Sequence, residues 1–80
     1  MKHKHTPTSI ARYQEVGARV RYIRENAGLS LADVVRRLDP PKPARITLLR
    51  WETGEIAIGI DRLEQLARIF NVNPGDLLGY

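Results

Sequence analysis

Residues 44–54 read ARITLLRWETG, and this stretch decides the fold of the chain. A helix turns by about 100° per residue, so one side of the stretch collects residues that can face a core, namely Ala44, Thr47, Leu48 and Trp51. The other side collects two arginines and two aliphatic residues, namely Arg45, Ile46, Leu49 and Arg50. Pro43 suits the first helical position, and Gly54 suits the residue that ends a helix. We therefore expect a helix from Pro43 to about Thr53 whose arginine side faces outward.

The outward side of this helix combines charged and apolar groups in a way that suits a DNA major groove. Arg45 and Arg50 can donate hydrogen bonds to guanine, while Ile46 or Leu49 can touch thymine methyl groups. The N-terminus of the helix also favours phosphate. An alternative stays open, in which Ile46 and Leu49 pack beneath the neighbouring proline-rich stretch or in a dimer contact.

Four further helices are expected around this one. Apolar residues recur at helical spacing from Ile10 to Ala27, and Ser30 with Asp33 forms a capping box that opens the next helix. A later helix starts near Gly59 and is expected to bury Ile60, Leu63, Leu66, Ala67 and Phe70. A short last helix follows the cap Asn73. No stretch alternates between apolar and polar residues as a strand does, so we expect an all-α, compact bundle of five helices.

Composition narrows the class of protein further. The chain has 80 residues, of which 42% are hydrophobic and only 6% aromatic, so aliphatic side chains must build the core of a single domain. It contains no cysteine, which excludes disulfides, thiol catalysis and cysteine-based zinc fingers. Its apolar runs are too short to span a membrane and it begins with no secretory signal, so we expect a cytoplasmic protein without membrane partners.

Charge is distributed unevenly along the chain. Residues 1–50 carry 11 of the 13 basic residues and 4 of the 9 acidic ones. This asymmetry favours one face made for a polyanion. Residues 1–8 are expected to be a flexible basic arm, and residues 9–80 the folded domain. His3 and His5 form an H-x-H pattern in that arm, which we interpret as incidental because a third metal ligand is missing. No catalytic constellation is recognisable, so we expect neither an enzyme, nor a cofactor, nor a metal site.

Three motifs follow one another at the spacing of a known family: GLSLADVVRRL (28–38), ITLLRWETGE (46–55) and DRLEQLARIFNVNPGDLL (61–78). Together they resemble the helix-turn-helix family of phage repressors, Cro and XRE-type bacterial regulators. The resemblance implies that the second helix crosses the DNA backbone and the third lies in the major groove. It also implies a bacterial or phage origin.

The resemblance implies roles for individual residues. Base-reading positions are matched by Arg45, Ile46 and Arg50. Positions that meet phosphate or sugar are matched by Thr47 and Thr53. Arg24 and Glu52 match a pair that forms a structural salt bridge in many members. The polar side of the second helix adds Arg36 and Arg37 as candidate contacts to the DNA backbone, although a solvated helix face explains them equally well.

The sequence departs from the family pattern in three places. The stretch DPPKP (39–43) lengthens the turn before the third helix, where Lys42 could approach a phosphate. Leu31 stands where the family often has a glutamine that contacts phosphate. Glu55 and Ile56 occupy a loop that is usually basic.

These observations predict a sequence-specific double-stranded DNA-binding transcriptional regulator that binds paired half-sites as a homodimer. The expected dimer surface consists of the aliphatic C-terminal residues Val72, Leu77 and Leu78 with Tyr80. A different interpretation is that these residues simply close the small core, and the two uses are compatible. The alternative is an antitoxin or adaptor module whose main role is to bind a protein, for example a toxin or polymerase.

Overall fold

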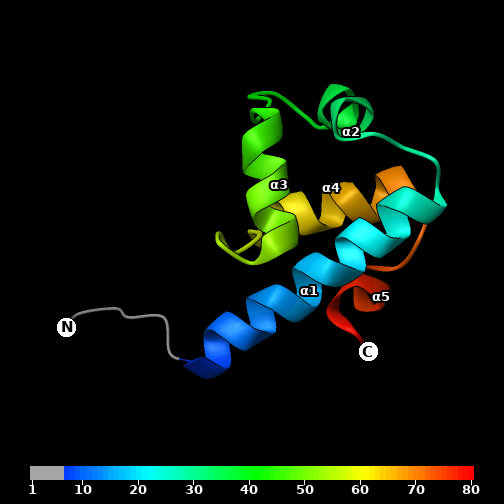
Figure 1. Ribbon diagram of the computed structural model, residues 1–80. Helices are drawn as coiled ribbons and strands as arrows, with labels where there is room; N and C mark the ends of the chain where they lie inside the picture. The colour runs from blue at the N-terminus through cyan, green and yellow to red at the C-terminus, as the bar shows by residue number, and fades with distance from the viewer. Residues whose placement is uncertain (1–6) are drawn as a thin grey trace.

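This computed structural model describes residues 7–80, which fold into five helices joined by loops and contain no strand (Figure 1). Their bounds are α1 (Pro7–Asn26), α2 (Leu31–Arg37), α3 (Arg45–Thr53), α4 (Ile60–Phe70) and α5 (Pro74–Leu78). The long α1 runs across the molecule, with α5 against it and with α2 and α3 as a pair to one side (Figure 1). The predicted all-α, five-helix architecture is confirmed.

Local sequence signals set the helix boundaries. The hydroxyl of Ser30 accepts a hydrogen bond from the N–H of Asp33 at 3.0 Å, and the Asp33 carboxylate accepts one from the N–H of Ser30 at 2.8 Å. At α5 the Asp76 carboxylate accepts a hydrogen bond from the N–H of Asn73 at 3.0 Å. Gly54 has φ 83° and ends α3 in the left-handed region. The predicted caps at these three positions are confirmed.

One aliphatic core joins all five helices. Its buried members are Val20, Val34, Leu38, Leu48, Trp51, Leu63, Leu66, Ala67, Phe70 and Leu77. Each helix contributes at least one of them, so no helix can be removed without exposing apolar surface.

The start of α3 and the start of α4 correct three expectations. Pro43 does not begin α3, because Ala44 keeps an extended backbone and Arg45 is the first helical residue. Ala44 is therefore exposed as the N-cap and does not face the core. Ile60 was expected to be buried, but it is 70% exposed because it borders a groove beside the proline-rich turn.

The C-terminal segment helps to close the core. Leu77 is fully buried, and Val72 and Leu78 are half-buried. Arg12 of α1 donates a hydrogen bond to the Leu78 carbonyl at 2.7 Å and lies over the ring of Tyr80, 5.8 Å from its centre. Leu77 therefore closes the core, while Val72 and Leu78 are partly exposed and Tyr80 is exposed, and a dimer contact through this segment stays a prediction.

The N-terminal helix starts earlier than expected. Residues 7 and 8, assigned to the arm by the sequence, belong to α1. The rest of that arm, with His3 and His5, lies outside the described residues. Across residues 7–80, no helix has both the length and the apolar character needed to cross a membrane.

Candidate nucleic-acid interface

Helix α3 is fixed against α1 by direct backbone contact at its C-terminal end. A Cβ atom placed on Gly17 would meet the carbonyl oxygen of Trp51 and would lie 2.7 Å from that of Glu52. Only glycine allows the two helices to approach this closely. The Trp51 side chain is buried in the same contact region, as expected for a core anchor.

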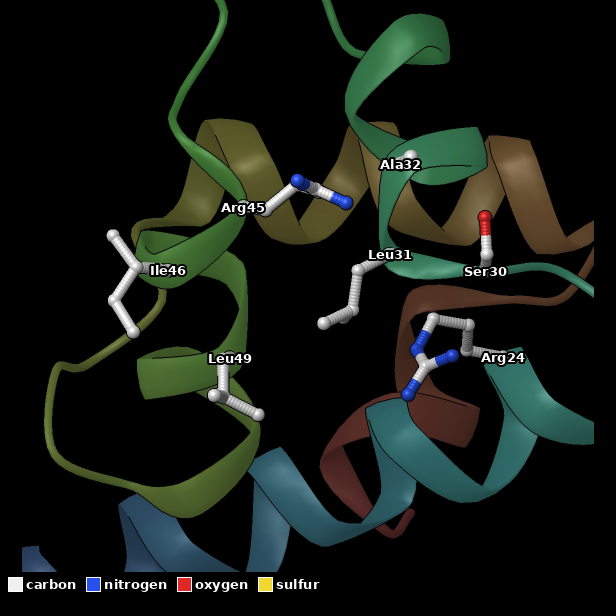
Figure 2. A pocket seen from close by; sticks show the side chains of 7 residues that line it. All are labelled: Arg24, Ser30, Leu31, Ala32, Arg45, Ile46 and Leu49. Carbon is white, nitrogen blue, oxygen red and sulfur yellow. The ribbon is translucent and has the colours of Figure 1, made fainter.

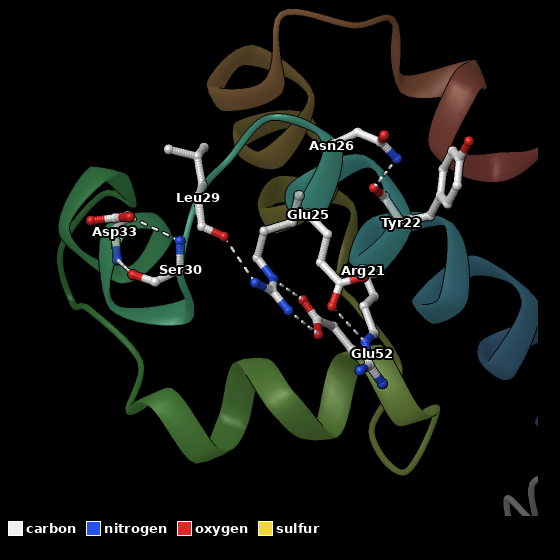
Figure 3. A network of polar contacts seen from close by, with 9 residues as sticks. Arg21, Tyr22, Glu25, Asn26, Leu29, Ser30, Asp33 and Glu52 are labelled. Carbon is white, nitrogen blue, oxygen red and sulfur yellow. Dashed lines mark hydrogen bonds and ion pairs between the residues drawn. The ribbon is translucent and has the colours of Figure 1, made fainter.

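A buried ion pair fixes the same junction (Figure 3). Arg24 Nε donates to Glu52 Oε2 at 2.6 Å, and Arg24 Nη2 donates to Glu52 Oε1 at 3.0 Å. Arg24 Nη1 donates to the Leu29 carbonyl at 2.9 Å, which ties the α1–α2 link into the network. Hydrogen bonding to Glu52 raises the pKa of Arg24 above its ordinary value, and desolvation opposes this only in part. The two residues expected to form a structural salt bridge therefore meet, and they hold α1 and α3 together.

The outer side of α3 presents two arginines and two aliphatic side chains. Arg45 and Arg50 are exposed, Ile46 is 49% exposed and Leu49 is 37% exposed. Within residues 7–80 neither arginine forms a hydrogen bond or an ion pair, so both guanidinium groups keep all their donors for another molecule. The orientation predicted from the helical pattern is the one observed.

A groove of about 590 Å³ separates this side of α3 from the start of α2 (Figure 2). It is lined by Arg24, Ser30, Leu31, Ala32, Arg45, Ile46 and Leu49. Arg45 reaches across from α3 toward α2, and Leu31 projects from α2 toward α3 (Figure 2). Leu31 thus gives the groove an apolar wall at the position where the family often has glutamine.

The side chains predicted to contact the DNA backbone differ in their exposure and in the partners that they have within the protein. Arg37 is exposed and has no partner among the described residues, whereas Arg36 pairs with Asp33. The hydroxyl of Thr53 is exposed and donates to the Arg50 carbonyl at 3.2 Å. Thr47, also expected to meet the DNA backbone, is half-buried.

Lys42 is engaged within the protein. Its ammonium group donates to the carbonyl of Arg36 at 2.7 Å and also to the carbonyl of Leu38. A third contact, to the carbonyl of Val35, measures 3.5 Å. Lys42 therefore satisfies carbonyl groups at the end of α2, and its contact with a DNA phosphate stays a prediction.

Two residues of α4 were missed by the sequence analysis. Arg62 and Gln65 both form hydrogen bonds with the proline-rich turn, which lies more than twenty residues earlier in the chain. Both lie within the motif at residues 61–78, but the motif assigns them no role, and their spacing marks only the polar side of an amphipathic helix.

The comparison with known families agrees with this geometry. Residues 15–79 match the helix-turn-helix domain family, and the chain belongs to that family. No curated protein and no solved structure matches the chain. In helix-turn-helix domains that bind DNA, the second helix of the motif enters the major groove. By the resemblance described above, α2 and α3 are the helices expected to correspond to this pair.

Proposed function

We propose that this protein is a sequence-specific regulator that binds double-stranded DNA in the manner of phage repressors, Cro and XRE-type regulators. The observation that carries the proposal is the outer side of α3, where two unpaired guanidinium groups flank two exposed aliphatic side chains. The fixed junction with α1 supports it, because a rigid helix can present these groups in one register.

Within this proposal the side chains divide into two groups. Arg45 and Arg50 donate to the O6 and N7 atoms of guanines, and Ile46 or Leu49 contacts thymine methyl groups. Arg37, together with Arg36 and the threonines of α3, approaches the phosphates. The phosphate contacts supply salt-dependent affinity, and the base contacts supply the choice of sequence.

A single copy offers little surface for reading bases, since α3 is only nine residues long. We therefore propose binding as a homodimer to two half-sites about 34–36 Å apart, one turn of the double helix. Such a complex would regulate transcription by covering promoter DNA or by contacting polymerase.

A different function, that of an antitoxin or adaptor, is favoured by one observation. Ile46 and Leu49 are exposed on α3 and Ile56 is 40% exposed, and the exposed Glu55 that follows α3 would repel a phosphate approaching that end of the helix. A protein partner would cover such a surface equally well.

Binding to DNA at two salt concentrations separates these functions. The purified 80-residue chain is titrated with labelled random duplex, and its preferred site is then selected from a random pool. The proposed regulator binds random duplex at low salt, loses affinity steeply as salt rises and enriches one sequence. The double variant Arg45→Ala/Arg50→Ala should lose the enrichment, whereas Arg21→Ala/Arg68→Ala, with the same charge change elsewhere, should keep it. Failure to bind duplex even at low salt would contradict the proposal and favour the adaptor.

A further inference from the structure

The connection between α2 and α3 is long for a helix-turn-helix, and it has no regular structure of its own. It covers residues 38–44, whereas the usual turn has three or four residues. Among the described residues, positions 39–43 exchange no backbone hydrogen bond with any other backbone group. The shape of this turn therefore depends on its prolines and on side chains that bond to it.

Helix α4 supplies most of those bonds through one arginine. Arg62 Nη1 donates to the Asp39 carbonyl at 2.8 Å, and Arg62 Nη2 donates to the Pro41 carbonyl. Arg62 Nη1 also donates to Gln65 Oε1 at 2.8 Å, and the same oxygen accepts the N–H of Asp39 at 3.1 Å. Arg62 thus holds two carbonyl groups of the turn directly and orients the glutamine that holds a third backbone group.

The turn is also held from the side of α2, where Lys42 donates to the carbonyl groups at the end of that helix. Two cations, one in the turn and one in α4, are therefore used to fix the turn. Both cations donate to backbone carbonyl groups, so both contribute to the shape of this connection.

The two ends of α3 are fixed by different means. Its C-terminal end lies against α1 through Gly17 and the Arg24–Glu52 ion pair. At its N-terminal end the N-cap is Ala44, which has no polar side chain, and the first fully buried residue is Leu48. Arg45 stands directly after the turn and before that first anchor, so its position depends on the shape of the turn.

We propose that Arg62 is a positioning residue for DNA recognition: by holding the Asp39–Pro43 turn against α4, it places Arg45 in register with its base pair. This inference rests on the proposed function and adds a specificity determinant that does not itself touch DNA. The position of Arg45 should depend on Arg62, whereas the position of Arg50, at the other end of α3, should not.

Coupling between these residues provides the test. Arg62→Gln is compared with Arg68→Gln, a matched loss of charge on α4 whose guanidinium lies 3.9 Å from Asp39 in an exposed pair. Affinity is measured for the selected site and for random duplex. Arg62→Gln should lower the ratio of the two affinities by about tenfold, while Arg68→Gln should leave it nearly unchanged.

The double variants supply a readout that a general loss of stability would not produce. In the Arg62→Gln background, Arg45→Ala should cost much less affinity for the selected site than in the wild type, whereas Arg50→Ala should cost as much as before. Equal, additive effects of Arg45→Ala and Arg50→Ala in both backgrounds would overturn the proposal. So would an unchanged affinity ratio in Arg62→Gln.

A second variant and a hydrogen-exchange measurement decide the outcome if Arg62→Gln does not fold or the wild type does not bind DNA. If Arg62→Gln does not fold, Arg62→Lys is used instead, because lysine keeps the charge and one donor nitrogen. Arg62→Lys should show the same selective coupling with Arg45, but the coupling should be weaker. Hydrogen exchange at the Asp39 amide should be faster in Arg62→Gln than in Arg68→Gln. A wild type that binds no duplex would contradict the proposed function, and the exchange rate would still decide whether Arg62 holds the turn.

Discussion

Arg24 and Glu52 form a two-pronged ion pair that is almost closed to water. The distances are 2.6 Å and 3.0 Å, and the side chains are 11% and 1% exposed respectively. The pair joins α1 to α3 across 28 positions of sequence. Because the carboxylate is enclosed, its removal leaves a buried guanidinium with too few acceptors, and this cost exceeds what the intact pair contributes.

Glu52→Gln should therefore lower the free energy of unfolding by about 3–5 kcal/mol, measured by urea denaturation. The matched control is Glu25→Gln, which breaks the exposed Arg21–Glu25 pair and should cost less than about 1 kcal/mol. Replacing both members, as in Arg24→Met/Glu52→Leu, should recover a large part of the loss. Equal costs for the two glutamine variants would contradict the account of the buried pair.

Gly17→Ala should destabilise the same junction by steric contact. The added methyl group would meet the backbone carbonyl groups of Trp51 and Glu52, which cannot rotate away as a side chain can. We expect a loss of about 1–3 kcal/mol. Thermal unfolding followed by circular dichroism measures it, with Gly59→Ala as the control because an added Cβ there meets no atom within 4 Å. The interpretation fails if Gly17→Ala is as stable as the control.

The features that could be predicted from the sequence are those that depend on residues close to one another in the chain. The caps at Ser30 and Asn73 and the end of α3 at Gly54 were predicted because they depend on residues within one turn of helix. The outward side of α3 was predicted because helical periodicity fixes it once Trp51 and Leu48 are buried.

What was missed depends on how the chain packs. The bonds from Lys42 to carbonyl groups at the end of α2, only four and six positions away, depend on the shape of the turn between them. Arg62 lies within the motif at residues 61–78 but was given no role, because its partners in the turn lie 21 and 23 positions earlier in the chain. Ile60 fits the apolar pattern of α4, yet it is 70% exposed at the first position of the helix, where it borders the groove beside the turn. Periodicity alone does not contain this information.

The capping box of α2 predicts sensitivity to acid. Hydrogen bonds from the N–H and the side chain of Ser30 lower the pKa of Asp33 below its ordinary value of 3.8, and Arg36 adds a smaller effect. A lowered pKa in the folded state means that the ionised carboxylate stabilises the fold. This stabilisation is complete above the ordinary value and is lost as the pH falls through the lowered one.

Asp33→Asn should accordingly unfold at a lower temperature than the wild type at pH 6, and the difference should shrink below about pH 4. Melting curves between pH 2 and pH 7 measure this, with the exposed Glu64→Gln as control. A difference that stays constant over that range would show that the charge of Asp33 plays no part.

Two arginines should differ in what they contribute to DNA binding, although both are exposed and unpaired within residues 7–80. Arg45 lies on the outer side of α3, so Arg45→Ala should cost about 1–3 kcal/mol on the preferred site and relax the choice of base there. Arg37 lies at the end of α2, so Arg37→Ala should weaken binding to all sequences alike and reduce the salt slope by about one. Fluorescence anisotropy on the selected site, single-base variants of it and random duplex, each at several salt concentrations, separates the two patterns. A uniform loss for Arg45→Ala would make it a phosphate contact, and the reading of bases would then have to rest on Arg50 and the aliphatic side chains between them.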